Sequence, residues 1–138
     1  MKIPILPAAV VLTTLFTTAQ AQEVLVKDKG VALSYKSEYT KSITCGTKKF
    51  AQYKITAYLE NNSGHTINIG YSDVSHNGYR NKTDVSPCEH PRQTRYLFDI
   101  KNSWGNASSE SGVYYVLVPE GDELPQPSWN LGKFEFID

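Results

Sequence analysis

Alternation of apolar and polar residues with a period of two recurs along most of this chain. The clearest example is the segment Phe50 to Glu60, in which one set of alternate positions is apolar: Tyr53, Ile55, Ala57 and Leu59. Successive side chains of a β-strand point to opposite faces, so this pattern predicts a strand with one buried and one solvated face. No stretch of ten or more residues has the three- and four-residue spacing of an amphipathic helix.

Similar patterns predict six further strands, separated by residues that favour turns. These strands are Glu23 to Val26, Val31 to Tyr35, Thr66 to Tyr71, Thr94 to Ile100, Gly112 to Val118 and Lys133 to Ile137. Asp28-Lys29-Gly30 predicts a turn between the first two. Asn61 to Gly64 tolerates positive φ and predicts a hairpin that pairs Phe50 to Glu60 with Thr66 to Tyr71.

Two of these strands carry more specific expectations. Val113 to Val118 is apolar or aromatic at nearly every position, which predicts a central strand covered on both faces. In the last strand, Phe134 and Phe136 fall on the same face and are expected to point inward.

About seven short strands in a chain of this length predict an all-β fold with a single antiparallel β-sandwich. In strand count and patterning the chain resembles immunoglobulin-like and fibronectin type III-like domains. It departs from true immunoglobulin domains because no Trp lies between Cys45 and Cys88 and Ser86-Pro87 precedes the second cysteine.

The first 21 residues have the pattern of a secretory signal peptide. Lys2 precedes the apolar run Ile3 to Phe16, and Ala19 and Ala21 stand at the small-residue positions of a cleavage site. The run is shorter than the roughly 20 apolar residues that a membrane-spanning helix needs. We therefore expect residues 1–21 to be cleaved, residues 22–138 to form one domain without a transmembrane segment, and the protein to be periplasmic or extracellular.

The net charge of the expected mature chain is close to zero. Without Lys2, 13 basic side chains stand against 14 acidic ones. Nucleic-acid-binding and anionic-membrane-binding domains carry a basic stripe or patch, so the composition does not support either partner.

Cys45 and Cys88 are the two cysteines of the chain. An even pair in a small exported domain predicts one disulfide, and a pair of free thiols is the alternative. On the chain-entropy model, closing a loop of about 44 residues stabilises the fold by up to about 4 kcal/mol. We expect the bond to tie a loop to the end of a strand.

The polar segment Ser72 to Gln93 is predicted as a long loop, and such loops are often functional. His76, Tyr79 and Arg80 in this segment are candidate contacts for a ligand or partner. The alternative is a surface excursion with a short extra strand.

Potential metal ligands also occur in this segment: His76, Cys88, Glu89 and His90. Because a cysteine in a disulfide cannot ligate, we expect no metal and no other cofactor.

Aromatic side chains provide a second set of candidates. Trp104, in the polar segment Asn102 to Ser111, and Trp129, after Pro127, are candidates for a platform that stacks on sugars or anchors a partner. Alternatively, Trp129 caps the core and Trp104 lies over a sheet edge.

Three predicted loops match the acceptor pattern for N-glycosylation. They are Asn61-Asn62-Ser63, Asn81-Lys82-Thr83 and Asn106-Ala107-Ser108. Polar loops also produce this pattern by chance.

The chain contains no Gly-x-Ser-x-Gly turn, no phosphate-binding glycine loop and no acidic pair whose spacing indicates glycosidase chemistry. We therefore expect an exported non-enzymatic domain that binds a protein or cell-surface partner through its loops. Two alternatives remain: a carbohydrate-binding module that uses Trp and Tyr, and a small hydrolase whose residues meet only in three dimensions.

Overall fold

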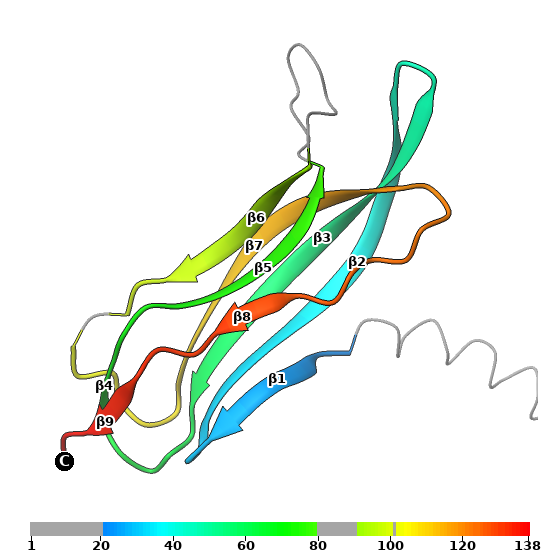
Figure 1. Ribbon diagram of the computed structural model, residues 1–138. Helices are drawn as coiled ribbons and strands as arrows, with labels where there is room; N and C mark the ends of the chain where they lie inside the picture. Colours follow the sequence, from blue (N-terminus) through cyan, green and yellow to red (C-terminus); the bar gives the residue numbers. More distant parts are fainter. Residues whose placement is uncertain (1–20, 80–90, 101) are drawn as a thin grey trace, which may run out of the picture.

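A computed structural model of the protein describes residues 21–79, 91–100 and 102–138 (Figure 1). Within these ranges the chain forms nine β-strands and no helix, so the predicted all-β class is confirmed. The described ranges therefore contain no helix long and apolar enough for a bilayer crossing. The predicted signal peptide lies outside the described residues except for Ala21, and its removal stays a prediction.

The first three strands pair antiparallel in the order of the sequence. They are β1 (Glu23–Asp28), β2 (Val31–Cys45) and β3 (Lys48–Asn61). Lys29 and Gly30 have φ of 50° and 87°, which confirms the predicted turn between β1 and β2. The far end of the β2–β3 hairpin projects beyond the other described strands (Figure 1).

The remaining six strands continue this sheet and add a small second one. They are β4 (Ile67–Ile69), β5 (Ser72–Tyr79), β6 (Pro91–Phe98), β7 (Ser108–Pro119), β8 (Ser128–Asn130) and β9 (Phe134–Phe136). The main sheet has the order β1-β2-β3-β7-β5-β6, and β8 also pairs with β5. β4 and β9 form a separate two-stranded ribbon.

The main sheet curls so that its two ends enclose one core. β7 pairs with β3 along its whole length but meets β5 at a single pair, Tyr79 opposite Leu117. Beyond this junction β5 and β6 lie over β7 instead of extending the sheet beside it (Figure 1). Their buried side chains Val74 and Phe98 join one apolar cluster with Leu33 of β2 and Ile55 of β3.

The finer architectural prediction is not established. Seven strands belong to one continuous hydrogen-bonded sheet, whereas a sandwich of the immunoglobulin-like or fibronectin type III-like kind consists of two separate sheets. The curl nevertheless buries the inner faces of the strands as a second sheet does.

The predicted hairpin after Asn61 is wrong. Both edges of β3 are already occupied, by β2 and by β7, and the short β4 pairs with β9. The Asn61 amide nitrogen lies 2.9, 3.1 and 2.9 Å from the carbonyl oxygens of His65, Trp104 and Gly105. These contacts direct the chain away from β3 and toward β9.

Both described ends of the predicted loop from Ser72 to Gln93 are paired strand. β5 and β6 pair in unbroken register from Ser72 opposite Phe98 to Tyr79 opposite Pro91. Residues 80–90, between the two strands, lie outside the described residues. The alternative interpretation of this segment, with a short extra strand, is confirmed in that β5 is present. Its bounds were not predicted because Asp73, Asn77 and Gly78 have low strand propensity, which pairing on both edges of the strand overrides.

Candidate functional site

His76, a predicted contact residue, lies in the core. It is 1% exposed, and its Nδ1 lies 2.6 Å from the hydroxyl of Tyr114 on β7. The edge of its ring meets Tyr35 of β2 with 5.8 Å between ring centroids. His76 is therefore inaccessible to a ligand or partner, and its assignment as a surface contact is wrong.

Burial determines the protonation of the groups around His76. It lowers the pKa of His76 to about 4. Burial also raises the pKa of the Tyr114 hydroxyl, with smaller contributions from Tyr35 and Asp73. The pKa of Tyr35 is raised by burial and then by Glu23, whose carboxylate accepts its hydrogen bond at 3.4 Å. His76 and both tyrosines are consequently neutral at neutral pH.

Tyr79 lies at the junction of β5 and β7, where its ring packs against Phe50 with a centroid separation of 4.7 Å. It also lines a hollow of about 260 Å³ together with Leu117, Pro119 and Glu123. Tyr79 is partly buried and helps to close the end of the curled sheet. Arg80 lies outside the described residues.

The two tryptophans lie on different elements. The backbone of Trp104 exchanges hydrogen bonds with Ile67 of β4, at 2.9 and 3.0 Å, and its side chain packs partly buried against the core. Trp129 lies in β8 opposite Val74 and is 44% exposed. No ring contact joins the two described indoles, so the paired platform that the sequence suggested is not assembled.

Cys45 is the last residue of β2, at the end of the projecting hairpin, and it is not a free cysteine. Its predicted partner Cys88 lies outside the described residues, so the bond between them stays a prediction. Glu89 and His90 also lie outside. Among the described residues, no three His, Cys, Asp or Glu side chains are grouped as metal ligands.

His65 lies beside a carboxylate, a feature that the sequence reasoning missed. Its Nδ1 lies 3.3 Å from Asp138, and its ring stacks on Phe136 with centroids 4.3 Å apart. The backbone amide of Thr66 donates to the same carboxylate and is the main reason that the pKa of Asp138 is lowered. Within the described ranges, no hydroxyl or thiol that could serve as the nucleophile of a hydrolase dyad hydrogen-bonds to the other nitrogen of His65.

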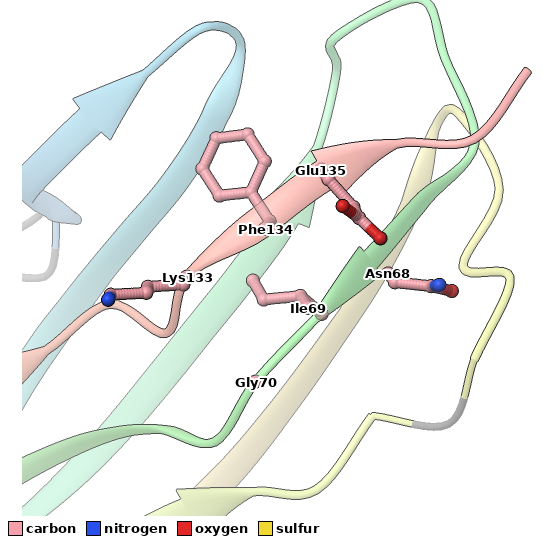
Figure 2. A pocket seen from close by; sticks show the side chains of 6 residues that line it. All are labelled: Asn68, Ile69, Gly70, Lys133, Phe134 and Glu135. Atoms are coloured by element: carbon pink, nitrogen blue, oxygen red, sulfur yellow. The ribbon is translucent and has the colours of Figure 1, made fainter.

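The β4–β9 ribbon forms a shallow groove of about 390 Å³ (Figure 2). Its lining residues are Asn68, Ile69, Gly70, Lys133, Phe134 and Glu135. The side chains of Asn68 and Glu135, which are paired in register, extend to one side of the ribbon, and Lys133 extends away from them (Figure 2). Asn68 accepts a hydrogen bond from the Ser103 amide at 3.0 Å.

The described lining of this groove supplies hydrogen-bonding groups, the carboxylate of Glu135 and the ammonium group of Lys133. Among the described residues that line it, Glu135 is the single carboxylate, and none is a histidine or a cysteine. Phe136, expected to point inward, is instead 43% exposed, whereas Phe134 is partly buried and packs against the core.

The outer face of β3 and β7 carries an exposed apolar pair. Val113 and Tyr115 are 44% and 47% exposed, and they lie opposite Thr56 and Lys54 in the β3–β7 register. We call these four residues the outer patch. The prediction that β7 is covered on both faces is therefore wrong at Val113 and Tyr115, although it holds at Leu117, which is fully buried.

No family model and no curated protein matches this chain. Among solved structures it is similar to one described as "X-ray structure of Northeast Structural Genomics Consortium target SoR45", with a TM-score of 0.38 and 10% sequence identity. The similarity covers 78% of this chain and 86% of that chain. At this TM-score it establishes neither a shared fold nor a function.

Proposed function

We propose that this protein is an exported, non-enzymatic binding domain that docks a protein partner on its outer patch. The observation that carries the proposal is the exposure of Val113 and Tyr115 on the outer face of a central strand. The solvated face of an antiparallel sheet is ordinarily polar. Neighbouring apolar side chains that stay exposed on such a face can mark an interaction surface.

The composition of the outer patch suits a protein partner. Tyrosine is enriched at protein interfaces because its large ring buries area at little entropic cost. Tyr115 and Val113 are two residues apart on one face of β7, and their β3 neighbours Lys54 and Thr56 contribute methylene and methyl groups beside them.

Charge around the outer patch specifies the partner further. Lys36 of β2 lies opposite Thr56, and Glu38 lies opposite Lys54, so this part of the face holds two lysines and one glutamate. A complementary partner has an apolar centre with a carboxylate-bearing rim. The proposed contact thus lies on the face of the sheet and not in the loops that the sequence suggested.

Site-specific photo-crosslinking tests the proposal. A photoreactive phenylalanine analogue replaces Tyr115 in one variant and Tyr39, which is 54% exposed on the β2–β3 hairpin, in a control. The expected result is a crosslink to one defined protein from position 115 and not from position 39. The identified partner is then purified for titration calorimetry.

The second stage measures affinity with the double variant Val113→Ser/Tyr115→Ser. Loss of two interface anchors is expected to weaken binding at least tenfold, or about 1.4 kcal/mol. Tyr39→Ser is the matched control and is expected to bind like the wild type. Unchanged affinity in the double variant, with its circular dichroism also unchanged, would refute the outer patch as the docking site.

Binding of a glycan instead of a protein is the alternative that the same variants can detect. Trp129 is 44% exposed, so a sugar that stacks on it would quench or shift tryptophan fluorescence. Glycan binding that is lost in Trp129→Ala and kept in the double variant would replace the protein-partner proposal with the carbohydrate-binding alternative.

A further inference from the structure

Two buried side-chain atoms in the described part of the chain have no hydrogen-bond partner. They are Nε2 of His76 and Oγ1 of Thr94. Buried polar groups in native proteins are almost always hydrogen-bonded, to protein or to ordered water. Two such atoms close together therefore indicate a shared partner.

The strand register places these two atoms side by side. His76 of β5 lies directly opposite Thr94 of β6. Directly opposed residues of an antiparallel pair point to the same face, with Cβ atoms roughly 4.5–5.5 Å apart. The two orphan atoms thus line the same small part of the core, yet they do not bond to each other.

The contact with Tyr114 indicates which nitrogen of His76 carries the proton. The Tyr114 hydroxyl has one described hydrogen-bond partner, His76 Nδ1 at 2.6 Å. Donation by Tyr114 satisfies its own proton and leaves Nδ1 as the acceptor. The neutral ring then carries its proton on Nε2, which needs an acceptor.

We infer that one internal water molecule is bound between His76 and Thr94. It accepts a hydrogen bond from His76 Nε2–H and donates one to Thr94 Oγ1. Water supplies both the acceptor and the donor that these atoms require, and internal waters typically bind buried polar groups that lack a protein partner. A charged ligand is disfavoured because the groups packed on His76 in the structure, Tyr35 and Tyr114, are neutral.

This water completes a polar chain across the core. The chain runs from Tyr114 of β7 through His76 of β5 to Thr94 of β6. β5 and β7 share a single strand pair, at Tyr79 and Leu117, so the chain links the two layers away from that junction. Buried networks of this kind favour one packing arrangement over alternatives when every member is satisfied.

Nuclear magnetic resonance of the wild-type protein tests both parts of the inference. Long-range 15N correlation spectra of His76 are expected to show a protonated Nε2 and an unprotonated Nδ1. Water cross-relaxation spectra are expected to show a long-lived water near the His76 ring and the Thr94 methyl group. A proton on Nδ1 at neutral pH, or a high-resolution crystal structure with Nε2 bonded directly to Oγ1, would overturn the inference.

Substitutions at Thr94 supply the matched comparison. Thr94→Val keeps the shape but removes the hydroxyl, so the count of long-lived internal waters by 17O relaxation dispersion is expected to fall by one. Thr94→Ser, which keeps the hydroxyl, and Thr44→Val, on the exposed hairpin, are expected to retain the wild-type count. An unchanged count in a folded Thr94→Val also contradicts the inference. If that variant does not fold, the wild-type spectra decide the question.

Discussion

At the scale of the single residue, Asn61 organises the point where the chain leaves β3. It is fully buried, and its amide nitrogen contacts three backbone carbonyl oxygens, those of His65, Trp104 and Gly105. Its Oδ1 accepts from both the amide and the hydroxyl of Ser63, at 3.1 and 2.7 Å. A glycan on Asn61 is therefore incompatible with this fold, although its sequence matches the acceptor pattern.

We predict that Asn61→Ala lowers the free energy of unfolding by about 2–3 kcal/mol, because it removes the hydrogen bonds of a fully buried side chain and leaves a cavity in its place. Urea unfolding monitored by circular dichroism measures the change. The adjacent Asn62 has an exposed side chain, so Asn62→Ala is the control and is expected to stay within about 0.5 kcal/mol of wild type. Equal effects at the two positions would contradict the role assigned to Asn61.

His76 makes the stability of the fold sensitive to acid. Its folded pKa, about 4, lies below the ordinary value of 6.5, so the unfolded chain takes up the proton first as the pH falls. The neutral ring therefore contributes its full stability above about pH 6.5. The contribution declines between pH 6.5 and pH 4 and levels off below that range. Between pH 6.5 and pH 4 the free energy of unfolding is therefore expected to fall by about 3 kcal/mol on account of His76.

The variant His76→Gln is expected to remove this decline. Its free energy of unfolding is lower than that of wild type at pH 7, because Tyr114 loses its optimal partner. Its pH dependence between 6.5 and 4 is expected to be shallower by about the amount assigned to His76. Urea unfolding at half-unit pH steps gives both curves, and parallel curves over this range would show that another group causes the acid sensitivity.

At the scale of the elements, β6 packs closely on β7 at Gly112, which lies against the ring of Tyr96. A Cβ added at Gly112 of β7 would overlap the ring of Tyr96 of β6. Gly112 therefore permits the close approach of the strands that fold over each other. The sequence pattern of β7 does not reveal this requirement, because Tyr96 is distant in the chain.

We predict that Gly112→Ala destabilises the fold by about 1–3 kcal/mol, because the ring or the strand must shift. A double variant with Tyr96→Leu is expected to recover part of this loss, which a double-mutant cycle by urea unfolding measures. Gly105→Ala is the control, since its Cβ would meet no atom closer than the Ser108 hydroxyl oxygen at 3.7 Å. Strict additivity in the cycle would show that Tyr96 is not the cause.

The end of the β2–β3 hairpin carries the predicted disulfide. Non-reducing peptide mapping of protein from the exported fraction is expected to join Cys45 to Cys88. Reduction, or the variant Cys45→Ser/Cys88→Ser, is expected to lower the free energy of unfolding by up to about 4 kcal/mol. Detection of two free thiols in the intact exported protein would contradict the pairing.

At the scale of the whole molecule, the predicted cleavage site after Ala21 lies just before the first described strand. β1 begins at Glu23, and the side chain of Gln22 donates to Ser34 at 2.9 Å. A chain that starts at Gln22 therefore keeps every described strand and the outer patch. These observations leave export itself as a proposal.

We predict that exported protein begins at Gln22, which N-terminal sequencing determines. A recombinant chain of residues 22–138 is expected to show a β-rich circular dichroism spectrum and one cooperative thermal transition. A mature protein that retains residues 1–21, or a shortened chain that does not fold, would contradict the assigned boundary.

Features encoded by neighbouring residues were predictable from the sequence, whereas features set by contacts between distant residues were not. The turn at Lys29-Gly30 and the strand around Ile55 were predictable because neighbouring residues encode both backbone turn and alternation. The hairpin after Asn61 was mispredicted because a turn-prone segment does not reveal that both edges of β3 are occupied. His76 was placed at the surface because its neighbours are polar, whereas pairing with β6 and packing on Tyr114 bury it.

The amino-acid sequence by itself determined the all-β class, most strand positions and the solvated face of β3. Period-two alternation is a property of adjacent residues, so it can be read without knowledge of the rest of the chain. Tertiary structure alone decided which strands pair, how the sheet curls and which apolar side chains stay uncovered. Val113 and Tyr115 have the same local pattern as buried Leu117, and their exposure depends on elements remote in the chain that cover one end of β7 and not the other.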